Sequence, residues 1–82
     1  MSCLIVFHSL THAQIAGAAL QRGGLSAALV KPPVSLGRGS CAYGLMISDR
    51  NREAALALLA KTSRKPLGIY VGSNGAWREV SP

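Results

Sequence analysis

The stretch LGRGSCAYGLMI, residues 36–47, runs from a glycine-rich basic loop straight into a predicted β-strand, CAYGLMI (41–47). The segment before this loop, LSAALV (25–30), predicts another strand. Lys31-Pro32-Pro33 ends that strand, because proline has no N–H to donate to a β-ladder. Two strands therefore follow one another with no helix between them, and this pair decides the fold.

The other predicted elements lie on both sides of this pair. Apolar runs rich in β-branched residues indicate strands, and apolar residues at helical spacing indicate helices. In chain order we expect strand CLIVF (3–7), helix THAQIAGAALQRGG (11–24), helix REAALALLAK (52–61), strand LGIYV (67–71), turn GSNG (72–75) and a short edge strand from AWREV (76–80).

The order β-α-β-β-α-β predicts an α+β fold of the ferredoxin-like type. We expect a sandwich with a four-stranded antiparallel sheet in spatial order 4-1-3-2 and both helices on one face. Residues 1–71 would form this single domain, and residues 72–82 a turn with a short strand or tail. Since no helix covers the other face, a homodimer through that open face is a reasonable hypothesis.

The composition limits the class of protein. With 82 residues, of which 49% are hydrophobic, the chain is long enough for one folded domain. No apolar run approaches the roughly 20 residues of a membrane span, and the N-terminus lacks a signal peptide's basic start, so we expect a cytoplasmic protein with free thiols. Nine Lys and Arg against three Asp and Glu give a net charge of +6, which favours anionic partners.

The predicted topology brings residues that are distant in sequence to one edge of the sheet. They include both histidines and four cations but no acid: Phe7, His8, Ser9, Thr11, His12, Lys31, Arg38, Cys41, Arg64 and Lys65. A thiolate is the nucleophilic form of cysteine, and nearby cations and loop amides stabilise it. His8 could accept or deliver a proton. Cys41 is therefore the candidate reactive group.

Other interpretations of Cys41 stay open on these residues alone. It could be a small buried hydrophobe at a strand start. A disulfide with Cys3 is not expected, because the pairing puts Cys3 roughly 15–20 Å away and a bridge needs Cα atoms within about 7 Å. Without CxxC, and with few Cys and His, we expect no metal and no cofactor. The loose glycine pattern at 37–42 precedes a strand rather than a helix, so it is not a dinucleotide motif.

The motifs in their order resemble one family of small bacterial proteins, the putative selenium/sulfur carrier protein-like family. The resemblance covers about residues 4–71. It is carried by IVFHSLTHA (5–13), GGLSAALVKPP (23–33), GSC (39–41), REAALALL (52–59) and LGIYV (67–71). The family has one motif cysteine that is thought to carry sulfur or selenium, which here would be Cys41. The family pattern has Gly directly after it, where this chain has Ala42 and then Gly44.

The resemblance implies a carrier or accessory protein rather than a stand-alone enzyme. Cys41 would hold a persulfide or perselenide from a donor protein and relay it to an acceptor enzyme. Six residues would support the sulfur chemistry: His8, Ser9, Arg38, Gly39, Ser40 and Gly44. Lys31, Arg64 and Lys65 would dock the partners. The alternative is a non-catalytic interaction or regulatory domain for an acidic partner, with Cys41 structural; nucleic acid is not expected, since the aromatic pattern of RNA-binding modules is absent.

Overall fold

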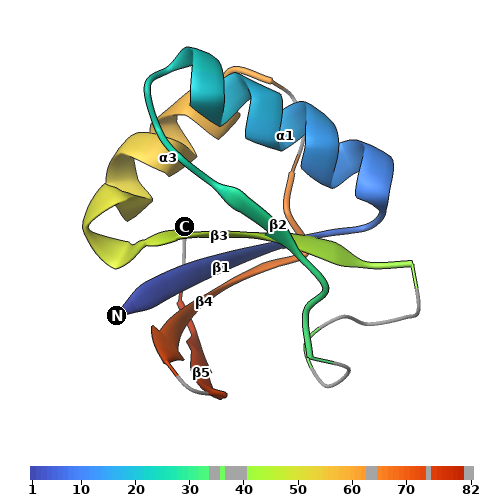
Figure 1. The fold of residues 1–82 in the computed structure, drawn as a ribbon, viewed down its shortest axis with the longest axis vertical. Helices are drawn as coiled ribbons and strands as arrows, with labels where there is room; N and C mark the ends of the chain where they lie inside the picture. The colour runs from blue at the N-terminus through green and yellow to red at the C-terminus, as the bar shows by residue number, and fades with distance from the viewer. Residues whose placement is uncertain (34–35, 37–40, 63–64, 74, 81–82) are drawn as a thin grey trace.

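The computed structural model describes residues 1–33, 36, 41–62, 65–73 and 75–80. Its helices and strands follow one another in the order that the sequence predicts. A short 3₁₀ helix, η1, precedes the second long helix (Figure 1). They are β1 Ser2–Phe7, α1 Leu10–Arg22, β2 Ala28–Val30, β3 Tyr43–Ser48, η1 Asp49–Asn51, α3 Arg52–Leu59, β4 Gly68–Ser73 and β5 Ala76–Glu79.

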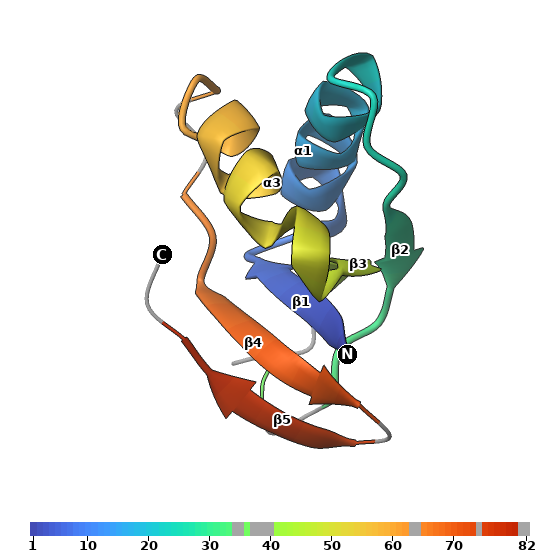
Figure 2. The ribbon, with the colours of Figure 1, turned by 90° about the vertical axis from the view of Figure 1, so that its left-hand side faces the viewer.

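The sheet is antiparallel and has five strands in the order β2-β3-β1-β4-β5. Both α1 and α3 cover one face of it, as Figure 2 shows. The predicted four-stranded ferredoxin-like sheet is therefore not fully matched. The first four strands keep the predicted neighbours, but β4 runs on to Ser73 and β5 pairs with it through Gly72↔Trp77 and Ser73↔Ala76. The expected boundary after residue 71 thus falls inside β4.

A glycine explains why the fifth strand can approach β4 so closely. A Cβ atom added at Gly72 would collide with the carbonyl oxygen of Ala76 in β5. The missing side chain at Gly72 leaves room for this backbone, and Gly75, at φ 85°, supplies the left-handed conformation that the turn needs. The GSNG turn signal therefore folds β5 back onto the sheet.

Two strands are shorter than the sequence predicts. β2 contains three residues, and β3 begins at Tyr43, two positions after Cys41. The ladder between them ends where Val30 pairs with Gly44. Beyond that pair, Pro32 has no N–H to offer, and the Ala42 carbonyl accepts a hydrogen bond from the Lys31 side chain. Cys41 consequently lies in a turn before the strand rather than within it.

Alternate residues of β1 face two separate hydrophobic clusters. Cys3, Ile5 and Phe7 pack under the helices, where small side chains such as Ala16 of α1 and Ala55 of α3 allow close contact. Leu4 and Val6 point to the opposite face.

This second face is not open, which corrects the expectation from sequence. Leu4 is 1% exposed and Val6 is fully buried. They pack with two other buried residues and five partly buried ones: Ala42, Tyr70, Val30, Leu36, Met46, Leu67 and Trp77. Trp77 of β5 and Leu36 of the connector are among the side chains that cover this face. The homodimer stays a prediction, and its contacts would be made by the partly buried side chains that cover this face.

Candidate functional site

The two cysteines have opposite environments. Cys3 lies inside β1, is fully buried, and pairs with Ile47 near the far end of β3. Cys41 is exposed in the turn before β3, and both residues are free thiols, as the sequence predicted. Burial raises the pKa of the Cys3 thiol, and the Asp49 carboxylate raises it further while Arg52 acts against this. Cys41 is therefore the thiol that a partner can reach.

The strand pairings define the edge of the sheet where Cys41 lies. Phe7 at the end of β1 pairs with Tyr43, and Val30 at the end of β2 pairs with Gly44. Val6 pairs with Gly68 at the start of β4. Figure 1 shows the start of β3 and the beginning of α1 on the same side of the molecule. We call this the Cys41 edge; besides Cys41 its described polar and charged residues include His8, Ser9, Thr11, His12, Lys31 and Lys65.

Lys31 has the best-defined contacts at this edge. Its Nζ donates a 2.9 Å hydrogen bond to the carbonyl oxygen of Ala42, the residue after Cys41. The same nitrogen is 4.6 Å from the centroid of the Tyr43 ring, a cation–π distance. Docking of partners by Lys31 stays a prediction, and in the structure its ammonium group makes these two contacts within the chain.

Ser9 and the two histidines form a second group at the start of α1. Ser9 is the N-cap of α1, and its Oγ accepts a hydrogen bond from the His12 backbone N–H at 3.3 Å. The Ser9 hydroxyl also bonds with His12 Nδ1 at 2.8 Å, and the His8 and His12 rings are 5.9 Å apart between centroids. Sequence reasoning started the helix at Thr11 and missed this pair, although a serine three residues before His12 is the spacing of a cap.

Gly44 is explained by packing. It is buried in β3, and among the described glycines only Gly24 and Gly75 have positive φ. A Cβ atom at Gly44 would be 2.8 Å from Leu4 Cδ1 and 3.3 Å from the Ile5 carbonyl oxygen. Its role is therefore to make room for the second cluster. The predicted supporting residues Arg38, Gly39 and Ser40, and the predicted docking residue Arg64, lie outside the described residues.

Charge is distributed unevenly along β3. Asp49 follows the end of β3 that is remote from Cys41 and pairs with Arg52 at 3.3 Å. Glu53 lies in the first turn of α3 at the same remote end, and Glu79 lies in the edge strand β5. These are the three acids of the chain. The Cys41 edge therefore carries Lys31 and Lys65, whereas Asp49 and Glu53 lie at the remote end. Glu79, the last residue of β5, lines a groove together with Lys65.

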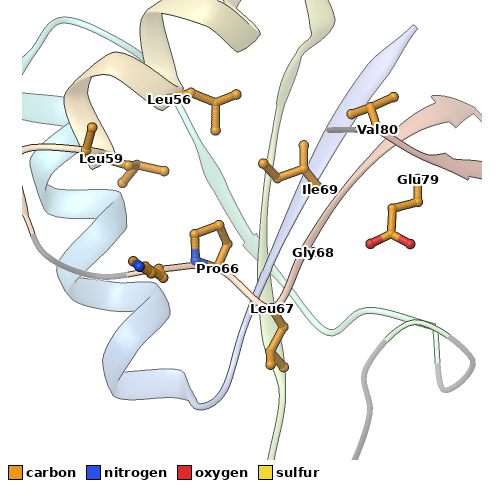
Figure 3. Close-up of a pocket in the computed structure, with 10 residues that line it drawn as sticks. Leu56, Leu59, Pro66, Leu67, Gly68, Ile69, Glu79 and Val80 are labelled. Atoms are coloured by element: carbon orange, nitrogen blue, oxygen red, sulfur yellow. The ribbon is translucent and has the colours of Figure 1, made fainter. Parts of the chain in front are cut away.

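An apolar groove that the sequence did not predict lies between α3 and the last two strands. It has a volume of about 560 Å³, and Figure 3 shows Leu56 and Leu59 on one side and Ile69 and Val80 on the other. Lys65 and Glu79 also line it. Three separate segments form this groove, 56–60, 65–69 and 79–80, so the pattern of no single helix or strand could have indicated it.

The helices in the described part of the chain are all too short or too polar to cross a membrane. Within the same residues, no three His, Cys, Asp or Glu side chains are grouped so that they could hold a metal ion.

Comparison with known proteins identifies the family. No curated protein matches the chain, and no solved structure matches it. The model of the family described as "Putative Se/S carrier protein-like" matches residues 2–71, which include β1, both long helices, β3 and most of β4. This match contains the turn with Cys41 and spans far more than half of the sequence. The chain therefore belongs to the Putative Se/S carrier protein-like family.

Proposed function

We propose that this protein carries sulfur or selenium on Cys41 and passes it from a donor protein to an acceptor enzyme. The observation that carries the proposal is the exposure of Cys41, against the complete burial of Cys3, in a chain of this family. A relay needs a thiol that two partners can reach in turn. It needs no deep pocket around that thiol.

The chemistry is an exchange between thiols with no net oxidation. The Cys41 thiolate attacks the terminal sulfur of a donor persulfide, a new S–S bond forms on Cys41, and the donor's S–S bond breaks. The donor leaves as a thiolate, and the terminal sulfur keeps its proton. In the second half, an acceptor nucleophile takes the terminal sulfur and Cys41 leaves as a thiolate. A perselenide reacts in the same way with selenium as the terminal atom.

The surroundings of Cys41 support this chemistry. His8 and Ser9 would hold or exchange the proton, and backbone amides near Gly39 and Ser40 would stabilise the anionic terminal atom. Arg38 would add positive charge, and Arg64 and Lys65 would attract acidic surfaces of the partners. A reducing cytoplasm, where thiols stay free, is the compartment in which such a relay would work.

The test is the intact mass of the purified protein after incubation with a cysteine desulfurase and cysteine. We expect one added sulfur atom that a reductant removes and that peptide mapping places on Cys41. Cys41→Ser should abolish this addition, and the matched variant Cys3→Ser should keep it. Loading of Cys41→Ser to the wild-type level would refute the proposal. Loaded protein should then give up its sulfur to an acceptor thiol enzyme.

The apolar groove favours a second candidate, an interaction domain. The partly exposed side chains of Leu56 and Val80 line the groove beside Lys65 and Glu79, which suits a partner that combines apolar and charged residues. Partner binding that survives Cys41→Ala but not a polar substitution at Leu56 would support this candidate over the carrier.

A further inference from the structure

The geometry points to Lys31 as the positioning residue for Cys41: its ammonium group holds the start of β3 in place and stabilises a sulfur anion on the neighbouring cysteine. This inference rests on the proposed function of Cys41. It assigns to Lys31 a role in the sulfur chemistry instead of the partner docking that the sequence suggested.

The strand register fixes where Lys31 lies. Val30 pairs with Gly44, so in antiparallel pairing the next residue, Lys31, lies opposite Tyr43. On the other side of β3, Tyr43 pairs with Phe7 of the central strand. The first residue of β3 is thus held between the ends of two strands, and Cys41 is two residues before it.

Among the described residues, two contacts hold the ammonium group at this place. The 2.9 Å hydrogen bond to the Ala42 carbonyl fixes its distance from the backbone, and the Tyr43 ring at 4.6 Å supports it from the side. A lysine side chain in solution samples many rotamers, whereas these contacts keep its charge near one point. They are made by the two residues that directly follow Cys41.

The consequence is electrostatic. Ala42 directly follows Cys41, so a cation bound to its carbonyl is within roughly 12 Å of the Cys41 sulfur, counting the Cα–Cα step of about 3.8 Å, the bonds on either side and the hydrogen bond. At about 10 Å, with a dielectric screening between that of a protein surface and that of water, one unit charge favours a sulfur anion about threefold. Other titratable or charged groups at the edge are His8, His12 and Lys65. In the sequence, Arg38 is three residues before Cys41, and Arg64 directly precedes Lys65. Lys31 is the one whose charge the described contacts fix beside Cys41.

The test measures alkylation of Cys41 by iodoacetamide, a neutral reagent, as a function of pH, with peptide mapping to separate Cys41 from Cys3. For Lys31→Met we expect a rate about threefold lower at neutral pH and equal to wild type at high pH, where every thiol is ionised. Lys31→Arg should keep the wild-type rate. Arg22→Met, which removes one charge at the far end of α1, should also keep it.

Three results would overturn the inference: an unchanged rate in Lys31→Met, a rate reduced equally at every pH, or an equal loss in Arg22→Met. The first would mean no influence on the thiol, the second a change in access, and the third an effect of net charge alone. If Lys31→Met does not fold, as judged by helical circular dichroism, Lys31→Gln takes its place. Alkylation needs no sulfur donor, so a failure here is distinct from a failure of wild-type protein to accept sulfur.

Discussion

The hydroxyl of Ser9 bonds with Nδ1 of His12 at 2.8 Å and also accepts the backbone N–H of His12 at 3.3 Å. One side chain thus caps α1 and holds an imidazole at the junction between β1 and α1. Since β1 is the central strand, this cap fixes where the first helix leaves the sheet. Ser9 was predicted as a supporting residue for Cys41, and the structure shows that it has a structural role as well.

Replacing Ser9 with alanine should therefore destabilise the protein. An unsatisfied N-cap costs about 1 kcal/mol in the free energy of unfolding. Ser9→Asp should keep most of the stability, because aspartate caps helices and its charge suits a helix N-terminus. Urea unfolding followed by helical circular dichroism measures both variants. Equal losses in Ser9→Ala and Ser9→Asp would show that Ser9 does not act as a cap.

Gly44→Ala should destabilise the protein by overpacking the second hydrophobic cluster. The new Cβ would meet Leu4 Cδ1 at 2.8 Å, and Leu4 is 1% exposed and has little room to move. Overpacking of this kind costs about 1–3 kcal/mol in the free energy of unfolding. In a Leu4→Val background, which removes the Cδ1 atom, the same substitution should cost less. An equal cost in both backgrounds, measured by urea unfolding, would contradict this packing argument.

Local patterns were enough to predict the elements but not their ends. Apolar periodicity indicated β1, α1, α3 and β4, because burial on one face dominates in such short segments. It placed Cys41 inside β3, whereas β3 begins at Tyr43 and its ladder with β2 stops at Gly44. Before this start the Ala42 carbonyl accepts a hydrogen bond from the side chain of Lys31, eleven residues away, and no pattern of either segment contains this contact.

The sequence predicted which strand ends meet at the Cys41 edge, but it did not predict the side-chain contacts. Strand order alone brought His8, Lys31 and Cys41 to the same side of the sheet. The cover on the second face was not predictable, because it depends on Trp77, in a fifth strand, and on Leu36, in a connector. Both side chains pack there through tertiary contacts. Since the sequence pattern does not show such contacts, it led to the expectation of an uncovered face that could form a dimer.

The buried thiol of Cys3 should make stability fall at alkaline pH. Burial, with the Asp49 carboxylate, raises the pKa of this thiol in the folded protein, so the folded chain keeps a proton that the unfolded chain loses above a pKa of about 8.5. The stabilisation is complete below that pH and is lost as pH rises through the higher pKa of the folded state. Cys3→Val should therefore show a shallower decline in the free energy of unfolding above this pH.

The matched control for Cys3→Val is Cys41→Ser, which removes the exposed thiol. It should not show the shallower decline expected of Cys3→Val, because it leaves the buried thiol of Cys3 in place. Urea unfolding at a series of pH values from neutral to alkaline gives the comparison. A Cys3→Val curve parallel to wild type would refute the role of this thiol.

Ala42→Gly restores the glycine of the family pattern, and we expect it to cost stability while leaving sulfur loading intact. Ala42 is 3% exposed and its methyl group packs in the second cluster, so its removal loses about 0.8 kcal/mol of burial. Added backbone freedom costs roughly 0.5–1 kcal/mol more. Sulfur loading should persist, because Lys31 bonds to the carbonyl oxygen of residue 42, which glycine keeps.

The control for this substitution is Ala28→Gly, at an exposed position in β2, which should show the backbone cost alone. If Ala42→Gly is no less stable than Ala28→Gly in urea, the methyl group does not contribute to the cluster; if Cys41 no longer accepts sulfur, the alanine itself is needed for the site.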